Sequence, residues 1–81
     1  MVLFEFTIEP FVEGQPGPHV IAAIAAAEAQ GLTVDVGPFG SSCEVPAVQV
    51  GEVARAVVHA AFANGATHVS FHAERLSGGG A

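Results

Sequence analysis

Two short segments joined by a turn constrain the fold of this chain most. Residues 32–36 and 42–45 each alternate apolar and polar side chains, and the Gly37-Pro38-Phe39-Gly40 sequence before Ser41 is typical of a hairpin turn. If Val36 lies opposite Ser41, polar residues oppose polar ones and apolar residues oppose mostly apolar ones. This match predicts a β-hairpin with one face in the core. The other face would carry Thr33, Asp35, Ser42 and Glu44.

The elements around the hairpin define the order of the fold. Residues 2–9 alternate apolar and polar side chains, as do residues 67–74, which predicts a strand at each end. Residues 19–30 and 50–64 have the apolar spacing of helices, and a glycine follows each. The inward side chains expected in these helices are Val20, Ile21, Ile24, Ala27, Val53, Val57, Ala60 and Ala61, and in the last strand Val69, Phe71 and Ala73.

The order β-α-β-β-α-β predicts an α+β fold of the ferredoxin-like kind. In this sandwich a four-stranded antiparallel sheet carries both helices on one face. Right-handed crossovers place the first and third strands in the centre and the other two at the edges. The second face of the sheet is then left without a helix, and we call it the open face.

Composition limits the possible partners. The 81 residues include eight acidic and two basic ones, with a formal charge of −6. Such a field repels a phosphate backbone, so nucleic-acid binding is not expected, whereas neutral or cationic small ligands are favoured. Hydrophobic residues make up 51% of the chain and charged residues 12%. This balance predicts that some surface is covered by another subunit.

The chain is expected to form a single domain over residues 1–76, followed by a disordered tail at 77–81. No basic segment precedes the first apolar residues, and no apolar run is long enough to cross a bilayer. Neither a signal peptide nor a membrane span is therefore predicted, and a cytoplasmic location is expected. The single cysteine, Cys43, excludes an internal disulfide and is expected to be a small buried side chain.

Polar side chains of all four strands gather on the open face. Several carboxylates within ~5–10 Å of one another repel each other, which costs stability unless a cation binds between them. Three interpretations stay open: a solvated surface, a subunit interface, or a site for a small molecule or metal. The residues expected on the open face are Glu5, Thr7, Glu9, Thr33, Asp35, Ser42, Glu44, His68, Ser70, His72 and Glu74.

Motifs for metal binding and catalysis are weak. His68 and His72 share a face but lie roughly 13 Å apart along one strand, too far to hold one ion without a neighbouring strand. The Ser41-Ser42-Cys43 segment lacks the context of a nucleophile elbow, and the glycine turn before it lacks the lysine of a phosphate loop. No metal, cofactor or catalytic residue is predicted. His19 and His59 are expected to be surface or boundary residues of the helices.

Three short sequences together resemble a known family. They are Ile8-Glu9-Pro10 at the end of the first strand, the turn from Gly37 to Ser41 followed by Glu44, and Gly65-Ala66 before the last strand. In this order and spacing the chain resembles the small thiamine-binding proteins of the YkoF type, over about residues 2–76. The resemblance implies a ferredoxin-like subunit that forms dimers or tetramers. It also implies binding of thiamine, or of its hydroxymethylpyrimidine moiety, without catalysis.

The expected site follows from this resemblance and from the open face. Thiamine carries a fixed positive charge on its thiazolium ring and hydrogen-bonding groups on its aminopyrimidine, so carboxylates, hydroxyls and an aromatic ring suit it. Carboxylates would meet the cation or the amino group, hydroxyls would bind the pyrimidine, and a phenylalanine at the hairpin tip would stack. The residues expected to bind the ligand are Glu5, Thr7, Glu9, Phe39, Ser41, Ser42 and Glu44.

Two other functions stay open at this point. One is a structural or regulatory assembly module, in which the acidic open face is an interface and no ligand binds. The other is a small enzyme of the dimeric α+β barrel kind, whose subunits share this topology. An enzyme of that kind would need an acid or base in its cavity, and His68 or His72 would be the candidate.

Overall fold

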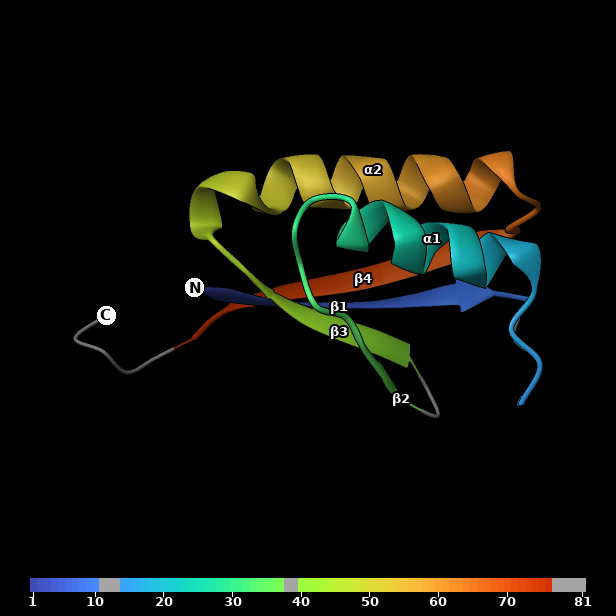
Figure 1. Cartoon of the computed structure of the whole chain (residues 1–81), viewed down its shortest axis with the longest axis horizontal. Helices are drawn as coiled ribbons and strands as arrows, with labels where there is room; N and C mark the ends of the chain where they lie inside the picture. The colour runs from blue at the N-terminus through green and yellow to red at the C-terminus, as the bar shows by residue number, and fades with distance from the viewer. Residues whose placement is uncertain (11–13, 38–39, 77–81) are drawn as a thin grey trace.

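The computed structural model describes residues 1–10, 14–37 and 40–76. All strand pairings in the sheet are antiparallel, and the strand order is β2-β3-β1-β4. Both helices lie on one side of the sheet (Figure 1). The elements are β1 (Val2–Glu9), α1 (Pro18–Glu28), β2 (Asp35–Gly37), β3 (Gly40–Val45), a 3-10 turn (Ala47–Gln49), α2 (Val50–Ala63) and β4 (His68–Arg75). The predicted ferredoxin-like α+β sandwich, with β1 and β3 in the centre, is confirmed. The tail predicted at 77–81 lies outside the described residues.

The central strand β1 supplies the largest part of the core. Its alternation is as predicted, with Val2, Phe4, Phe6 and Ile8 buried under the helices. Phe4 is fully buried, and its ring centroid lies 5.7 Å from that of Phe6 and 5.5 Å from that of Phe71 on β4. Helix α2 contributes three buried side chains to the core, Val53, Val57 and Ala61. Ala60, expected inward, is only half-buried.

Helix α1 presents a different stripe to the sheet from the one predicted. The buried residues are His19, Ala23 and Ala27, which are spaced by four, and Ile21 is 57% exposed. Val20 and Ile24 pack at the margin of the core. The prediction for Ile21 is wrong because the alanines around it give almost no contrast between the two sides of the helix, so apolar spacing does not locate the stripe.

His19 is a buried residue rather than a surface one. Its Nε2 lies 2.6 Å from the backbone oxygen of Pro10, which ties the start of α1 to the end of β1. The ring also lies over Gly17, where a Cβ atom would be 2.6 Å from the His19 Cε1 atom. Glycine at this position therefore makes room for the histidine that anchors the helix.

The edge strands are less covered than the alternation predicted. Strand β2 spans only three residues, although the predicted pairs Val36 with Ser41 and Asp35 with Ser42 are confirmed. Leu32 and Val34 lie before this strand and pack against the core, whereas Val36 is 61% exposed. On β4 the helix-facing Phe71 is also more than half exposed. The helices therefore cover the side chains of the central strands more completely than those of the edge strands.

Cys43 gives a prediction about stability in alkaline solution. Its side chain is buried at the centre of β3, and this burial raises the pKa of the thiol. The unfolded chain therefore releases the thiol proton first, and the free energy of unfolding should fall as the pH rises past the ordinary thiol pKa of ~8.5. The chain contains neither tyrosine nor lysine, so few other groups titrate there. Urea unfolding between about pH 7 and 10 should show this fall, and Cys43→Ala should flatten it; an equally steep fall in the variant would contradict the assignment.

Candidate functional site

The register of the sheet assembles a polar row across the open face. Glu5 on β1 lies opposite Ser42 on β3 on one side and opposite His72 on β4 on the other. Ser42 in turn lies opposite Asp35 on β2, so a single row crosses all four strands. Thr7 lies opposite Ser70 in the adjacent row. Two carboxylates, an imidazole and three hydroxyls are thereby brought to the middle of one surface.

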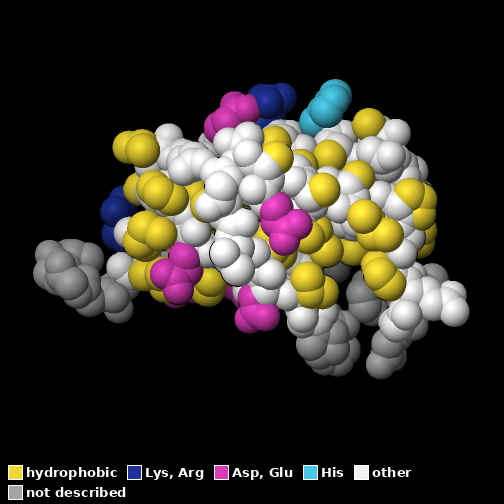
Figure 2. Space-filling view, viewed as in Figure 1, with side chains coloured by type: hydrophobic (Ala, Val, Ile, Leu, Met, Phe, Trp, Pro, Cys, Tyr) yellow, Lys and Arg dark blue, Asp and Glu magenta, His cyan; other side chains and the backbone are white. Residues whose placement is uncertain are grey.

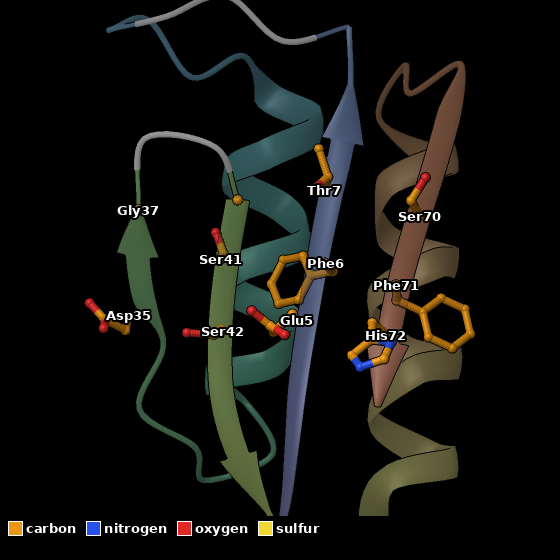
Figure 3. A pocket seen from close by; sticks show the side chains of 11 residues that line it. Glu5, Phe6, Thr7, Asp35, Gly37, Ser41, Ser42, Ser70, Phe71 and His72 are labelled. Atoms are coloured by element: carbon orange, nitrogen blue, oxygen red, sulfur yellow. The ribbon is translucent and has the colours of Figure 1, made fainter. Parts of the chain in front are cut away.

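A depression of about 520 Å³ lies over this row. Two glycines leave the space, because Gly37 and Gly40 face each other at the hairpin end and have no side chains to fill it. A Cβ atom at Gly40 would lie 3.0 Å from the Thr7 Oγ1 atom. Figure 3 shows Glu5 between Ser42 and His72 on the three longer strands. The lining residues are Glu5, Phe6, Thr7, Asp35, Gly37, Gly40, Ser41, Ser42, Ser70, Phe71 and His72.

The carboxylates in the lining of the depression are not balanced by a lysine or arginine. Glu5 and Asp35 are both exposed there, and the lining includes no arginine. Arg55 is held by Glu52 through an ion pair on α2, which also lowers the pKa of that glutamate. Between unit charges about 4 Å apart, attraction is worth ~1 kcal/mol in water and ~4 kcal/mol near a protein surface. A cationic ligand is therefore favoured in the depression, and an anionic one is disfavoured.

The predicted ligand residues divide into three groups. Glu5, Thr7 and Ser42 line the depression together. Ser41 borders it but is buried on the helix-facing side of β3, opposite Phe6 and Val36. The remaining predicted residues lie elsewhere, and Phe39 is outside the described residues.

Glu44 and Glu9 lie away from the depression. Glu44 lines a second hollow of about 660 Å³ near the start of β1, which shares Ser42 and Asp35 with the depression. Glu9 is at the opposite end of β1, facing His68, and its backbone oxygen accepts a hydrogen bond of 2.8 Å from the Thr67 N–H. The structure therefore does not bring Glu5, Glu9 and Glu44 together around one ligand.

Three polar lining residues were not among the predicted ligand residues. Asp35, Ser70 and His72 were expected on the open face, but nothing in the alternation of β4 says which of its residues faces Glu5. That information is in the pairing of β1 with β4, where Val2 lies opposite Arg75 and Glu5 opposite His72. Polar residues on these two alternating strands match at every shift of two positions, so the sequence leaves open which residue of β4 faces Glu5.

Within residues 1–10, 14–37 and 40–76, no three or more His, Cys, Asp and Glu side chains are placed to hold a metal ion together. His72 does have an acidic neighbour, since its Nε2 lies 3.8 Å from the Glu74 Oε1 atom. In the same part of the chain, no helix combines the length and apolar character needed to cross a membrane.

The fold is similar to that of a solved structure. The crystal structure of protein SP2199 from Streptococcus pneumoniae matches with a TM-score of 0.59 and 20% sequence identity, over 95% of this chain and 86% of that chain. At this identity the similarity supports the fold and carries no information on a ligand. No protein-family model matches the sequence, and no curated protein matches it.

Proposed function

We propose that this protein is a non-catalytic binding protein for thiamine or its hydroxymethylpyrimidine moiety, acting as a carrier, buffer or sensor. The observation that carries the proposal is the acidic depression on the open face, where Glu5 and Asp35 flank a glycine-floored hollow bordered by hydroxyl groups. Its volume of about 520 Å³ falls in the range of small-molecule sites, ~300–1,000 Å³. The resemblance of three sequence segments to the thiamine-binding family supports the same ligand.

The chemistry of thiamine matches this lining group by group. The thiazolium ring is permanently cationic, and Glu5 and Asp35 are the carboxylates that would meet it. The aminopyrimidine offers donors and acceptors to the hydroxyls of Thr7, Ser42 and Ser70. In this proposal, charge supplies most of the affinity and the hydroxyls orient the pyrimidine.

Calorimetric titration at low ionic strength tests the proposal. Thiamine should bind more tightly than hydroxymethylpyrimidine, because only thiamine carries the cation. Thiamine phosphates should bind less tightly than thiamine, because their phosphate groups are repelled by the carboxylates. Raising the salt concentration should lower the affinity for thiamine more than the affinity for hydroxymethylpyrimidine, because salt screens the attraction between exposed charges. Absence of heat with any of these compounds at millimolar concentration would contradict the proposal and favour an assembly role.

The glycine floor gives a second prediction. A methyl group at Gly40 would lie 3.0 Å from Thr7 Oγ1 and 3.1 Å from the Phe6 backbone oxygen, and it would occupy part of the hollow. Gly40→Ala should therefore weaken thiamine binding about tenfold, which is ~1.4 kcal/mol. Gly51→Ala on α2 is a matched control, because a Cβ atom there meets nothing within 4 Å. Equal affinities in the two variants would show that the ligand does not occupy the hollow beside Gly40.

A further inference from the structure

The outer edge of β4 is the longest uncovered strand edge in the described part of the chain. This strand has eight residues and pairs with β1 alone, whereas the opposite edge of the sheet ends in the three-residue β2. Long open edges tend to pair with another strand unless they are shortened, charged or covered. Here Glu74 and Arg75 cancel in formal charge, so the edge is neutral in a chain with a formal charge of −6.

The backbone groups that point outward from this edge can be identified. The Leu76 N–H donates to the Met1 oxygen at 3.0 Å, and this pair continues the register in which Arg75 lies opposite Val2. Hydrogen-bonded and non-hydrogen-bonded pairs alternate along antiparallel strands, so every second residue before Leu76 also points its N–H and C=O toward β1. The residues between them turn these groups away from the sheet. They are Val69, Phe71, Ala73 and Arg75.

Phe71 adds an apolar group at the middle of the same edge. Its side chain is 53% exposed and projects beyond β4 on the side away from β1 (Figure 3). It lies beside a hollow of about 380 Å³ that is lined by Ala54, Arg55, Val58, His59 and Phe71. Figure 2 shows hydrophobic side chains spread over the visible side of the molecule with few charged side chains among them. Val36 is also exposed on an edge strand, but β2 spans only three residues, so Phe71 is the exposed apolar residue on the longer open edge.

We propose that the β4 edge binds the β4 edge of a second copy of this chain, antiparallel and with Phe71 opposite the partner's Phe71. Opposite residues must lie on the same face of a continuous sheet. In this register His68 lies opposite the partner's Glu74, and the same pair recurs across the two-fold axis. Each of these two pairs sets an imidazole opposite a carboxylate that can accept a hydrogen bond from it, and the two phenylalanine rings meet where both are exposed.

The neighbouring register is less favourable. A two-fold axis at His72 would set two histidines opposite each other, Ser70 opposite the partner's Glu74, and Val69 opposite the partner's Arg75. Like groups would then face each other at the axis, and Phe71 would lose its ring partner. Complementarity along β4 therefore selects the register centred on Phe71.

This pairing has a consequence for the open face. Ser70 comes to lie opposite the partner's His72, and both residues line the depression of their own subunit. The two depressions then join across the axis, and each gains an imidazole from the other copy. The pairing is testable without any ligand, so its failure would leave the proposed thiamine function standing.

Sedimentation equilibrium on the full chain tests the pairing. The unmodified protein should have twice the mass of one chain at micromolar concentration. Phe71→Glu should raise the dimer dissociation constant by ~30-fold or more, because it sets two carboxylates against each other at the axis. Ala73→Pro should act similarly by removing an outward N–H that is not needed for pairing with β1. Ile21→Glu, at an exposed site on α1, should leave the dimer intact. Far-UV circular dichroism reports whether each variant is folded.

Cross-linking tests the register. In a Cys43→Ala background, Phe71→Cys places two thiols opposite each other with Cα atoms ~5.5 Å apart, which suits a disulfide. His72→Cys places them roughly 8 Å apart, beyond disulfide reach. We expect the Phe71→Cys variant, and not the His72→Cys variant, to form a covalent dimer efficiently. A monomeric protein, a dimer that survives both Phe71→Glu and Ala73→Pro, or preferential cross-linking by His72→Cys would each overturn the proposal.

Discussion

Phe4→Ala is expected to lower the free energy of unfolding by about 3–5 kcal/mol, the range for removing a buried phenylalanine. The Phe4 side chain is fully buried on the central strand, and it contacts the rings of Phe6 and Phe71 on two strands. The buried alanines of α1, Ala23 and Ala27, are too short to fill the space that the ring would leave. A domain of this size is stable by only ~4–12 kcal/mol, so the substitution should remove a quarter or more of the total stability.

Urea denaturation followed by circular dichroism measures this effect. Phe62→Ala is the matched control, because Phe62 is the same residue type but is 51% exposed on α2. Its effect should stay within about 0.5 kcal/mol, as for other surface substitutions. If both variants lost similar stability, the core would not be centred on β1 as described.

Glu5→Lys is expected to abolish thiamine binding, with at least a hundredfold loss of affinity. The substitution replaces the carboxylate between Ser42 and His72 by an ammonium group, so attraction for the thiazolium becomes repulsion. A change of ~3 kcal/mol in electrostatic energy corresponds to this loss, and reversal of one close charge supplies it at the effective dielectric of a protein surface. Calorimetric titration of the variant with thiamine measures the affinity.

Glu28→Lys makes the same change of net charge at a distance. Glu28 is exposed at the end of α1, on the other side of the sheet from the depression. The affinity of the Glu28→Lys variant for thiamine should stay within a few-fold of that of the unmodified protein, because only the long-range electrostatic field changes. A similar loss in both variants would mean that net charge, rather than the position of Glu5, controls binding.

The topology of the fold could be predicted because local signals agreed with one another. Alternation gave the buried face of β1, and matching polar residues gave the correct pairs of the hairpin. The glycines after the helices, Gly31 and Gly65, have φ values of +84° and +103°, which glycine adopts without strain. Each of these features depends on a few neighbouring residues, so the sequence alone determines it.

The coverage of the edges could not be predicted in the same way. Alternation shows which side of a strand a residue faces, but it does not show whether a helix reaches over that side. Val36 and Phe71 both face the helical layer and are more than half exposed. Their exposure depends on where the helices lie, which is a tertiary property.

The candidate site was predicted in part for a related reason. The sequence indicated an acidic open face and the roles of Glu5, Thr7 and Ser42, which the structure brings together in one depression. It did not separate Glu9 and Glu44 from them, because residues on one face of a strand can be far apart along it. The spacing of four residues places Glu5 and Glu9 roughly 13 Å apart along β1, and the register with β4 sets Glu5 opposite His72 and Glu9 opposite His68.

The most direct test of the account is a map of ligand-induced chemical shifts. Isotope-labelled protein is titrated with thiamine, and the amide resonances are followed by nuclear magnetic resonance. The account predicts saturable changes that are largest at Glu5, Thr7, Ser42, Ser70 and His72, with little change on the exposed sides of α1 and α2. Changes centred on the apolar hollow beside Val58, or no change at millimolar thiamine, would contradict the central claim that the open face is a thiamine site.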